Sequence, residues 1–510
     1  MRRARLIPLV GVMACIGCEL WATDGAQPDV RPPAVAGQFY PGDASRLTVA
    51  LQALAGDALA PRTDRPIAIV VPHASYIYSG QIAADAYRQA SAHQYDTIVI
   101  IGTNHTAADF GRISVYAGAG FRTPLGVAPV DQEVVAALLK EDAGCVTDAS
   151  VHAQEHSVEV QVPFVQHFFP RAKIVPVIVG RPDLQLCTRF GRALAKVVKG
   201  RQALIVASSD LSHYPGLADA SAADRHTLEA IATLDPATFQ TATEEEMGNR
   251  RANLVTCACG EGPIMAAMAA ATALGATRGV VISYTNSGEL SIGDPSRVVG
   301  YGAVVMTAGA RGRDISALAK PAVAAPGDPL QAQDKKALLV FARETIRRFL
   351  VTDTVPLARA DNPRLMRPQG AFVTLRKRGE LRGCIGTLVP EAPLGRTVGM
   401  MALQAAFGDP RFSRVGANEL KDIEIEVSAL TPMKPVSGAA DVRVGRDGVM
   451  LQKDGRSAVF LPQVAGEQGW NREEMLDNLC LKAGLPAGCW ARGAKLATFQ
   501  AEVFAEHEFK

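Results

Sequence analysis

Apolar runs alternate with amphipathic segments along residues 28–308. Short stretches rich in Val and Ile predict buried strands at 67–71, 96–102, 173–180, 203–208, 279–283 and 298–307. Between them, helical spacing or composition predicts helices at 81–91, 132–139, 183–198 and 263–274. Near-continuous apolar strands separated by helices favour an α/β fold, with a mostly parallel sheet covered by helices on both faces.

Residues 309–333 interrupt this alternation. They are rich in Ala, Pro and Gly and show no periodicity, which is typical of an extended linker between two folded units. The chain after it, 334–510, predicts a second and smaller α+β unit. Its expected helices are 335–349 and 397–407, and its expected strands are 370–376, 381–384 and 423–430.

The composition fits a folded protein of at least two units and excludes one class of partner. The chain has 510 residues, of which 48% are hydrophobic and 20% are charged. Its formal net charge is +2, and its basic residues are dispersed, so we expect no nucleic-acid partner. Beyond the amino terminus, no apolar stretch is long enough for a transmembrane helix.

Residues 1–27 predict an export segment of signal-peptide or lipoprotein type. Basic residues precede a short apolar stretch, and small residues then lead to Cys15 and Cys18. This pattern favours export, with a lipid anchor at Cys18 or Cys15 in the periplasm or on the membrane. A cleaved signal without a lipid, and a cytoplasmic protein with a misassigned start codon, are the alternatives. The other seven cysteines are widely spaced and indicate no disulfide framework.

Reactive side chains follow three of the predicted strands. His73 follows strand 67–71, His105 follows strand 96–102, and Asp210 and His213 follow strand 203–208. In open α/β sheets, ligands bind beyond the carboxyl ends of the strands. If the three strands are parallel, these side chains lie at one edge of the sheet.

Cys259 directly precedes the helix predicted at 263–274. Because a helix amino terminus stabilises an anion, we expect this thiol to be biased towards the thiolate. Imidazole and thiolate ligands suit zinc, iron and copper better than magnesium or calcium. His73, His105 and Cys259 are therefore candidate metal ligands, although a single strand-end histidine is more often a hydrogen-bonded structural residue.

Candidate acid–base groups accompany these ligands. The stretch H-A-Q-E-H-S-V-E at 152–159 places two histidines and two acids at helical spacing. We interpret His156 and His213 as acid–base or supporting groups, with Glu159 or Asp210 orienting them. Eight of the nine histidines precede the linker, so imidazole chemistry belongs to the first unit.

The first unit resembles the Memo family across nearly its full length. The matching motifs are A-G-Q-F-Y-P at 36–41, P-H-A-S-Y at 72–76, G-T-N-H at 102–105, E-H-S-V-E at 155–159, S-S-D-L-S-H at 208–213 and C-G at 259–260. The resemblance implies a fold like that of the class III non-haem iron dioxygenases (LigB-like) and a link to iron or copper redox chemistry. The implied metal ligands are His73, His105 and Cys259, and the other implied pocket residues are His156, Asp210 and His213.

Two positions depart from the family pattern. Ser75 stands where the family usually has glycine, which puts the backbone beside His73 in doubt. Cys257 is an extra cysteine close to Cys259, and in an oxidising compartment a disulfide between the two would remove a metal ligand.

The second unit resembles the AMMECR domain. The matching motifs are L-R-G-C-I-G-T at 381–387, D-P-R-F at 409–412 and F-L-P-Q-V at 460–464, followed by G-W at 469–470. Bacterial members of the two families are called AmmeMemoRadiSam system proteins B and A, which implies a radical-SAM partner protein. Cys384 is either a reactive thiol activated by Arg382 and Arg411 or a buried cysteine in a tight turn.

These features lead to three functional hypotheses. The leading one is a metal-dependent redox enzyme, in which iron or copper held by two histidines and a cysteine activates oxygen or a substrate. The first alternative is a non-catalytic protein that sequesters iron or copper, and the second is a peptide or protein docking module. A catalytic metal site keeps an open coordination position, whereas a sequestering site is closed.

Overall fold

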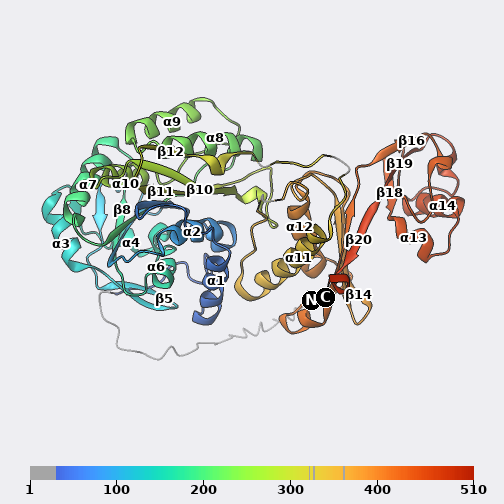
Figure 1. Cartoon of the computed structure of the whole chain (residues 1–510), viewed down its shortest axis with the longest axis horizontal. Helices are drawn as coiled ribbons and strands as arrows, with labels where there is room; N and C mark the ends of the chain where they lie inside the picture. The colour runs from blue at the N-terminus through green and yellow to red at the C-terminus, as the bar shows by residue number, and fades with distance from the viewer. Residues whose placement is uncertain (1–29, 321, 326–327, 360–361, 510) are drawn as a thin grey trace, which may run out of the picture.

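The computed structural model describes residues 30–320, 322–325, 328–359 and 362–509. The chain forms a large α/β body, a smaller α+β body and a small terminal body in a row (Figure 1), and each has its own hydrophobic core. The expected export segment, with Cys15 and Cys18, lies outside the described residues. Among the residues described, no helix is both long and apolar enough to span a membrane.

A nine-stranded mixed sheet forms the centre of the first unit, in the order β12-β10-β11-β2-β9-β3-β8-β4-β7. Its middle strands are parallel to one another: β2 (Pro66–Val71), β9 (Ala203–Ser208), β3 (Thr97–Thr103) and β8 (Lys173–Val179). The flanking strands are β10 (Arg278–Asn286), β11 (Gly300–Thr307), β12 (Gly312–Asp314), β4 (Ile113–Val115) and β7 (Cys145–Val146). Because β11 pairs with β2, and β4 with β8, in antiparallel fashion, the sheet is mixed.

Both faces of the sheet are covered, which explains why its middle strands are apolar at nearly every position. The connection from β2 to β3 through α2 (Tyr76–Ala90) crosses the sheet in one direction. The connection from β8 to β9 through α7 (Leu184–Val198) crosses it in the other. Right-handed crossovers therefore place α2 and α7 on opposite faces. Helix α10 (Glu261–Ala273) packs against α7.

The remaining elements of the first unit surround this sheet. The helices are α1 (Ala44–Gly56), α3 (Gln132–Glu141), α4 (Ser150–Ala153), α5 (His156–Glu159), α6 (Val162–Phe168), α8 (Leu217–Ile231) and α9 (Pro236–Gly248). A small second sheet contains β1 (Val30–Arg31), β5 (Gly120–Thr123) and β6 (Gly126–Pro129). Strand β12 lies within the stretch expected to be an extended linker and pairs with β10, so the main sheet continues past residue 308.

The remainder of the chain forms two bodies. The first has the antiparallel sheet β14 (Glu380–Thr387), β13 (Ala371–Lys377), β15 (Ile423–Leu430) and β20 (Ala501–Ala505), packed by α11 (Ala332–Thr352) and α12 (Leu394–Phe407). The terminal body has the sheet β16 (Lys434–Val436), β19 (Lys495–Phe499), β17 (Gly448–Lys453) and β18 (Arg456–Phe460), with α13 (Pro462–Glu467) and α14 (Arg472–Lys482). The smaller α+β unit thus contains two separate cores.

The cysteines differ in one place from the sequence-based expectation, which indicated no disulfide framework. Cys480 and Cys489 form a disulfide in the terminal body, because the chain turns back after α14 and brings the second cysteine to the end of that helix. Cys257 and Cys259 are both free thiols, so no disulfide removes Cys259 from the candidate metal shell.

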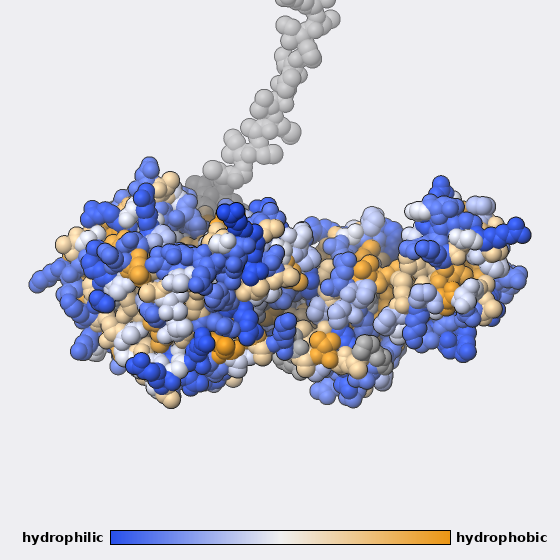
Figure 2. All heavy atoms as spheres, turned by 90° about the horizontal axis from the view of Figure 1, so that it is seen from above, coloured by the Kyte–Doolittle hydropathy of each residue, from blue (hydrophilic) through white to orange (hydrophobic). Residues whose placement is uncertain are grey.

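The surface is mostly hydrophilic on the face seen in Figure 2, where hydrophobic residues gather only in small patches. This pattern is ordinary for a folded protein, since apolar atoms always cover part of a surface. The more unusual feature is the set of polar side chains buried at the carboxyl edge of the main sheet, which includes His73, Ser208 and Asp210.

The contact between α7 and α10 depends on Gly191, because a Cβ atom there would overlap the carbonyl oxygen of Ala266. We expect Gly191→Ala to lower the free energy of unfolding by about 1–3 kcal/mol, the usual cost of overpacking a core. Chemical denaturation measures this change. Gly56→Ala, at a helix end with nothing within 4 Å of the added carbon, is the control and should be neutral or slightly stabilising.

Candidate metal centre

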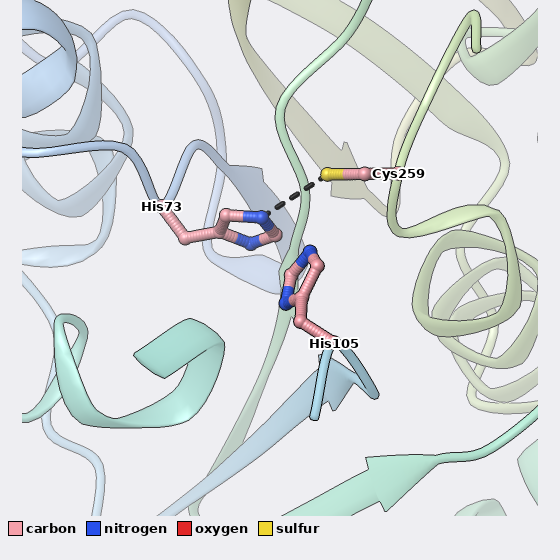
Figure 3. A group of neighbouring side chains, drawn as sticks. All are labelled: His73, His105 and Cys259. Carbon is pink, nitrogen blue, oxygen red and sulfur yellow. Dashed lines mark hydrogen bonds between the residues drawn. The ribbon is translucent and has the colours of Figure 1, made fainter. Parts of the chain in front are cut away.

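The three expected ligands meet at the carboxyl edge of the main sheet. His73 follows β2, His105 follows β3, and Cys259 lies two residues before α10. The Cys259 Sγ lies 3.1 Å from the His73 Nε2, and the two imidazole ring centres are 5.2 Å apart (Figure 3). One donor atom from each of the three lies within 4.8 Å of the others. Residues 186 positions apart in the chain are thus neighbours in the fold.

A chain of hydrogen bonds sets the tautomer of His73. The Ser208 hydroxyl donates its proton to the Ser157 carbonyl at 2.6 Å and accepts a hydrogen bond from the Gln161 amide at 2.9 Å. With its only proton used, Ser208 must also accept from the His73 Nδ1, which lies 3.1 Å away. The proton therefore sits on Nδ1, and the lone pair of Nε2 faces Cys259. Burial and the neighbouring histidines hold the pKa of His73 well below its usual value, so the ring is neutral.

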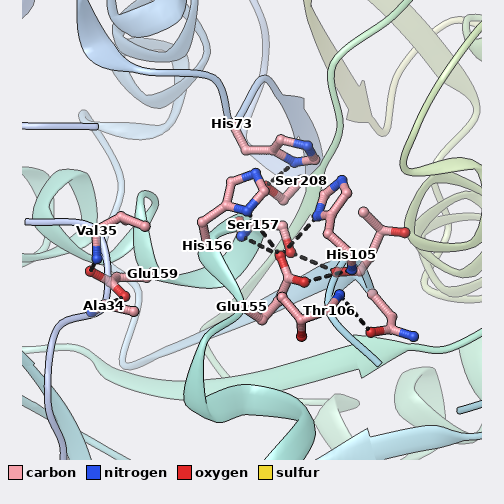
Figure 4. Close-up of polar contacts among 12 residues, drawn as sticks. Ala34, Val35, His73, His105, Thr106, Glu155, His156, Ser157, Glu159 and Ser208 are labelled. Atoms are coloured by element: carbon pink, nitrogen blue, oxygen red, sulfur yellow. Dashed lines mark hydrogen bonds and ion pairs between the residues drawn. The ribbon is translucent and has the colours of Figure 1, made fainter. Parts of the chain in front are cut away.

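Glu155 sets the tautomer of His105 in the same way. Its carboxylate lies 2.9 Å from the His105 Nδ1 and accepts a hydrogen bond of 2.6 Å from the His105 backbone N–H (Figure 4). Burial raises the pKa of Glu155, but hydrogen bonds from His105 and the Ser157 backbone outweigh this effect and bring the pKa to about 2. The charged carboxylate keeps the Nδ1 proton in place, which leaves the Nε2 lone pair of His105 free.

The sequence-based analysis assigned no role to Glu155 or Ser208, although both lie within the motifs used for the Memo resemblance. The available signal was position. Ser208 ends β9, the strand that lies between β2 and β3 in the sheet, so its side chain faces the space between the two ligand-bearing strands. Glu155 is the residue before α5, where its side chain caps the Ser157 N–H.

The expectation that Cys259 is biased towards a thiolate is wrong for the metal-free site. Burial, together with the nearby Asp210 carboxylate, raises the pKa of the Cys259 thiol well above its usual value. The helix amino terminus contributes too little to offset this desolvation, because its field acts only over the first turn. The thiol therefore carries its proton until a metal ion displaces it.

His156 and Asp210 lie against the three candidate ligands. The His156 ring stacks on His105 at 4.5 Å and lies 5.3 Å from His73. Burial and the neighbouring His105 lower the pKa of His156 to about 4. Asp210 accepts hydrogen bonds from the backbone N–H groups of His73 and Ala74, and burial raises its pKa to about 6.

His213 is part of the same constellation. It offers a donor atom that lies within 4.8 Å of donor atoms of Asp210 and Cys259. Burial lowers its pKa to about 4, and its Nε2 is buried with no hydrogen-bond partner in the described part of the chain. A buried ring nitrogen without a partner is costly in a protein interior, which suits an atom that faces a bound ligand.

Glu159 is not at this site, which corrects the role expected for it. Its carboxylate forms a fully buried ion pair of 2.7 Å with Arg31 and accepts hydrogen bonds from the Tyr40 hydroxyl and the backbone N–H groups of Ala34 and Val35. Figure 4 shows it turned away from the histidines. Glu159 therefore anchors the amino-terminal segment, while Glu155 contacts both His105 and His156.

Cys384 lies in the second unit, on β14, with both expected arginines nearby. Its backbone N–H donates to Asp409, and Arg411 bonds both Asp409 and the Cys384 carbonyl. Arg382 is paired with Glu419 at 2.7 Å. Because each guanidinium is neutralised by a carboxylate, the two cations contribute less to activating the half-buried thiol than their sequence positions indicated.

The donor set of the first unit fits a transition-metal ion. The imidazoles of His73 and His105 lie beside the Cys259 thiol, and their Nδ1 atoms are held by Ser208 and Glu155. Nitrogen and sulfur donors of this kind suit iron, copper or zinc. Supporting hydrogen bonds to the far side of each ligating histidine are typical of protein metal sites.

Comparisons with known proteins find relatives of both units. A family model described as Memo-like protein matches residues 31–305, and one described as AMMECR1 matches residues 339–504. A MEMO1 family protein of Aquifex aeolicus is 38% identical over 275 residues, covering 53% of this chain and 97% of the relative. A MEMO1 family protein of Methanopyrus kandleri is 37% identical over 291 residues, covering 55% of this chain and 99% of the relative.

Two crystal structures of uncharacterised proteins are also similar to parts of this chain. One, from Pyrococcus horikoshii, has 36% identity and a TM-score of 0.33, and covers 35% of this chain and 93% of that protein. The other, from Escherichia coli K12, has 12% identity and a TM-score of 0.33, and covers 47% of this chain and 100% of that protein.

The protonated thiol predicts that metal binding releases a proton. Because the Cys259 thiol is protonated and His73 is neutral, binding should release about one proton, from Cys259. Affinity should then rise with pH, because fewer protons compete with the metal. Calorimetric titration with Fe²⁺ in two buffers of different ionisation enthalpy measures the proton count. The Cys259→Ser variant should release none, and an unchanged count in that variant would mean that another group supplies the proton.

The different contacts of Glu155 and Glu159 predict opposite phenotypes. We expect Glu155→Gln to weaken metal binding by about 10–100-fold, because the carboxylate behind His105 is lost. Glu159→Gln should lower the free energy of unfolding by roughly 3–5 kcal/mol, because it leaves Arg31 buried without its partner. Competition with a chromophoric chelator and chemical denaturation separate the two effects, and each variant is the control for the other.

Proposed function

The chain belongs to the Memo-like protein family, and on this premise we propose that its first unit is a metal-dependent redox enzyme. His73, His105 and Cys259 would hold a non-haem iron or copper ion. Such an ion, when bound, would supply one-electron chemistry for the activation of oxygen or a substrate. The convergence of two imidazoles and a thiol on one point is the observation that carries this proposal.

The access to this centre supports turnover rather than storage. His73 and Asp210 are almost fully buried, but the side chain of His105 is 30% exposed, so a substrate can approach from that side. His156 borders the same side and is neutral above pH 4 or so. It can therefore accept a proton from a bound substrate and return it to a product.

His213 would serve the part of the centre near Asp210 and Cys259. Its unpartnered Nε2 can hold a proton or accept one, and Asp210 lies next to it. Asp210 acts mainly as a positioning group in this scheme, because its carboxylate is occupied by the backbone of His73 and Ala74. The substrate class that suits two bases beside a metal ion that would activate oxygen is a small phenol or diol. Molecular oxygen would be the oxidant, so the proposed reaction is dioxygenase-like.

A second candidate function is metal binding without turnover. Asp210 and His213 offer two further donor atoms close to Cys259. If both coordinate, the shell has up to five protein ligands and no open position, which is the arrangement of a sequestering site. A peptide or protein docking role becomes the preferred proposal only if the site binds no metal.

The second unit matches the AMMECR1 family, and the association of both families with a radical-SAM protein makes such an enzyme the first partner to test. We place any role of Cys384 in this partnership rather than in the metal chemistry, since the histidines of the described chain lie almost entirely in the first unit.

Metal content is the first test of this proposal. Protein loaded anaerobically with Fe²⁺ or Cu⁺ and then desalted should retain about one ion per chain. His73→Ala and Cys259→Ser should each lose it, because either change removes one of three ligands. His167→Ala, a histidine away from the site, is the matched control and should retain the ion. A wild-type protein that retains neither metal would contradict the metalloenzyme proposal.

The coordination number distinguishes the two candidate functions. X-ray absorption of the iron-loaded protein should show an exchangeable light-atom ligand besides two imidazoles and one sulfur. Nitric oxide should bind to this open position and give an electron paramagnetic resonance signal. His213→Ala should leave binding intact if His213 is an acid–base group, and should weaken it if His213 closes the shell.

A further inference from the structure

The segment 287–299, between β10 and β11, pairs with the backbone around His213 on one side and contacts the second unit on the other. We propose that Arg396, in α12 of the second unit, is a positioning residue for the metal centre. It holds this segment in place, and the segment in turn holds the backbone at His213. This inference rests on the proposed function only where metal binding is concerned, because the positioning itself is a property of the fold.

The first step is the pairing between the segment and the chain at His213. His213 lies opposite Val299 in an isolated antiparallel bridge. The hydrogen bonds beside it are Tyr214 N–H to Val298 O at 2.7 Å, Val298 N–H to Pro215 O at 2.9 Å and Gly300 N–H to Ser212 O at 2.9 Å. The residues on either side of His213 thus pair with the end of the segment and the start of β11, while the His213 N–H and carbonyl pair with Thr256 and Val255 on its other side. The segment is therefore one of the two neighbours that fix the backbone at His213.

Tyr214 makes this dependence stronger. Its φ angle is 74°, in the left-handed region that a non-glycine residue enters only when its surroundings require it. The guanidinium of Arg297 lies 4.0 Å from the centre of the Tyr214 ring. The segment therefore holds in place a backbone turn that would relax if the segment moved away.

The second step is the grip of the second unit on the same segment. The Arg396 side chain crosses between the units, donating from Nε to the Leu290 carbonyl at 3.2 Å and from Nη2 to the Gly293 carbonyl at 3.3 Å. Arg396 is only 5% exposed. Burial lowers its pKa and the nearby Glu289 carboxylate raises it. Leaving a buried guanidinium without hydrogen-bond partners costs free energy. Arg396 therefore resists separation from the Leu290 and Gly293 carbonyls.

Gly399 brings the helix close enough for this contact. It lies one turn after Arg396 on α12, and a Cβ atom there would overlap the Ser291 hydroxyl oxygen. Helix α12 therefore packs directly on the segment, with Arg396 and Gly399 on the same face.

Other ion pairs cross the same boundary without touching the segment. Arg359 binds Asp85 at 2.8 Å in α2, and Arg348 binds Asp57 at 2.6 Å at the end of α1. Losing either pair should loosen the contact between the units without changing the backbone at His213. They provide matched controls for a local effect of Arg396.

Hydrogen exchange of the metal-free, full-length protein tests the positioning directly. In Arg396→Gln we expect the amides of Tyr214, Val298 and Gly300 to exchange about tenfold faster or more, because the segment opens more often once its two carbonyl contacts are lost. Arg396→Lys, which keeps the charge and one donor direction, should give partial rescue. Arg359→Gln should leave these amides within about twofold of the wild-type rate.

A spectroscopic readout follows the metal centre itself. Co²⁺ bound by imidazole and thiolate has visible bands that respond to the surroundings of its ligands, so Arg396→Gln should shift these bands, whereas Arg359→Gln should not. Arg396→Gln should also weaken Co²⁺ binding only if His213 is itself a ligand. If Arg396→Gln does not fold, Gly399→Ala displaces the same helix from the same segment and replaces it in both measurements.

Wild-type exchange rates at these amides in a folded Arg396→Gln protein would overturn the inference. So would equal acceleration by Arg359→Gln, which would mean that any weakening of the contact between units has this effect. A wild-type protein that binds no metal would remove the proposed function but leave the exchange result, and with it the positioning role, to be decided separately.

Discussion

The candidate metal centre depends on the parallel arrangement of β2, β9 and β3 at the middle of the main sheet. Parallel strands end at the same edge, so His73 and His105 come together although the strands that carry them are not adjacent. The strand between them, β9, ends in Ser208 and leads to Asp210. Ser208 accepts a hydrogen bond from the His73 ring, and Asp210 accepts one from the His73 backbone N–H. One strand order therefore supplies both the ligands and the groups that orient them.

Burial decides the charge of the site as strongly as the residue types do. It keeps His73, His156 and His213 neutral, so their nitrogens are free for a metal or a proton. It also keeps the Cys259 thiol protonated, so this thiol adds no negative charge to the centre in the absence of metal. Glu155 nevertheless stays charged, because the hydrogen bonds that it accepts from His105 offset the cost of burying it.

Helix α12 links the two units physically. The amino-terminal half of this helix carries Arg396 and Gly399 against the first unit, and the chain just after its end carries Asp409 against Cys384. The same helix thus contacts the segment behind His213 and the thiol-bearing strand. Curated relatives such as the Aquifex aeolicus protein match the first unit over nearly their whole length, so in this chain a second unit covers a surface adjacent to that shared body.

The sequence by itself indicated the family, the middle strands of the main sheet and three candidate ligands that the fold brings together, because hydrophobic periodicity and strand-end motifs are local features of the chain. Only the tertiary structure decided which carboxylate serves the site. Glu155 precedes α5 in extended conformation and turns towards His105, whereas Glu159 ends that helix and faces Arg31, so helical spacing did not predict their directions. The protonated thiol and the disulfide between Cys480 and Cys489 could not be predicted from the sequence either. Desolvation and spatial proximity both depend on what the rest of the chain packs around a residue.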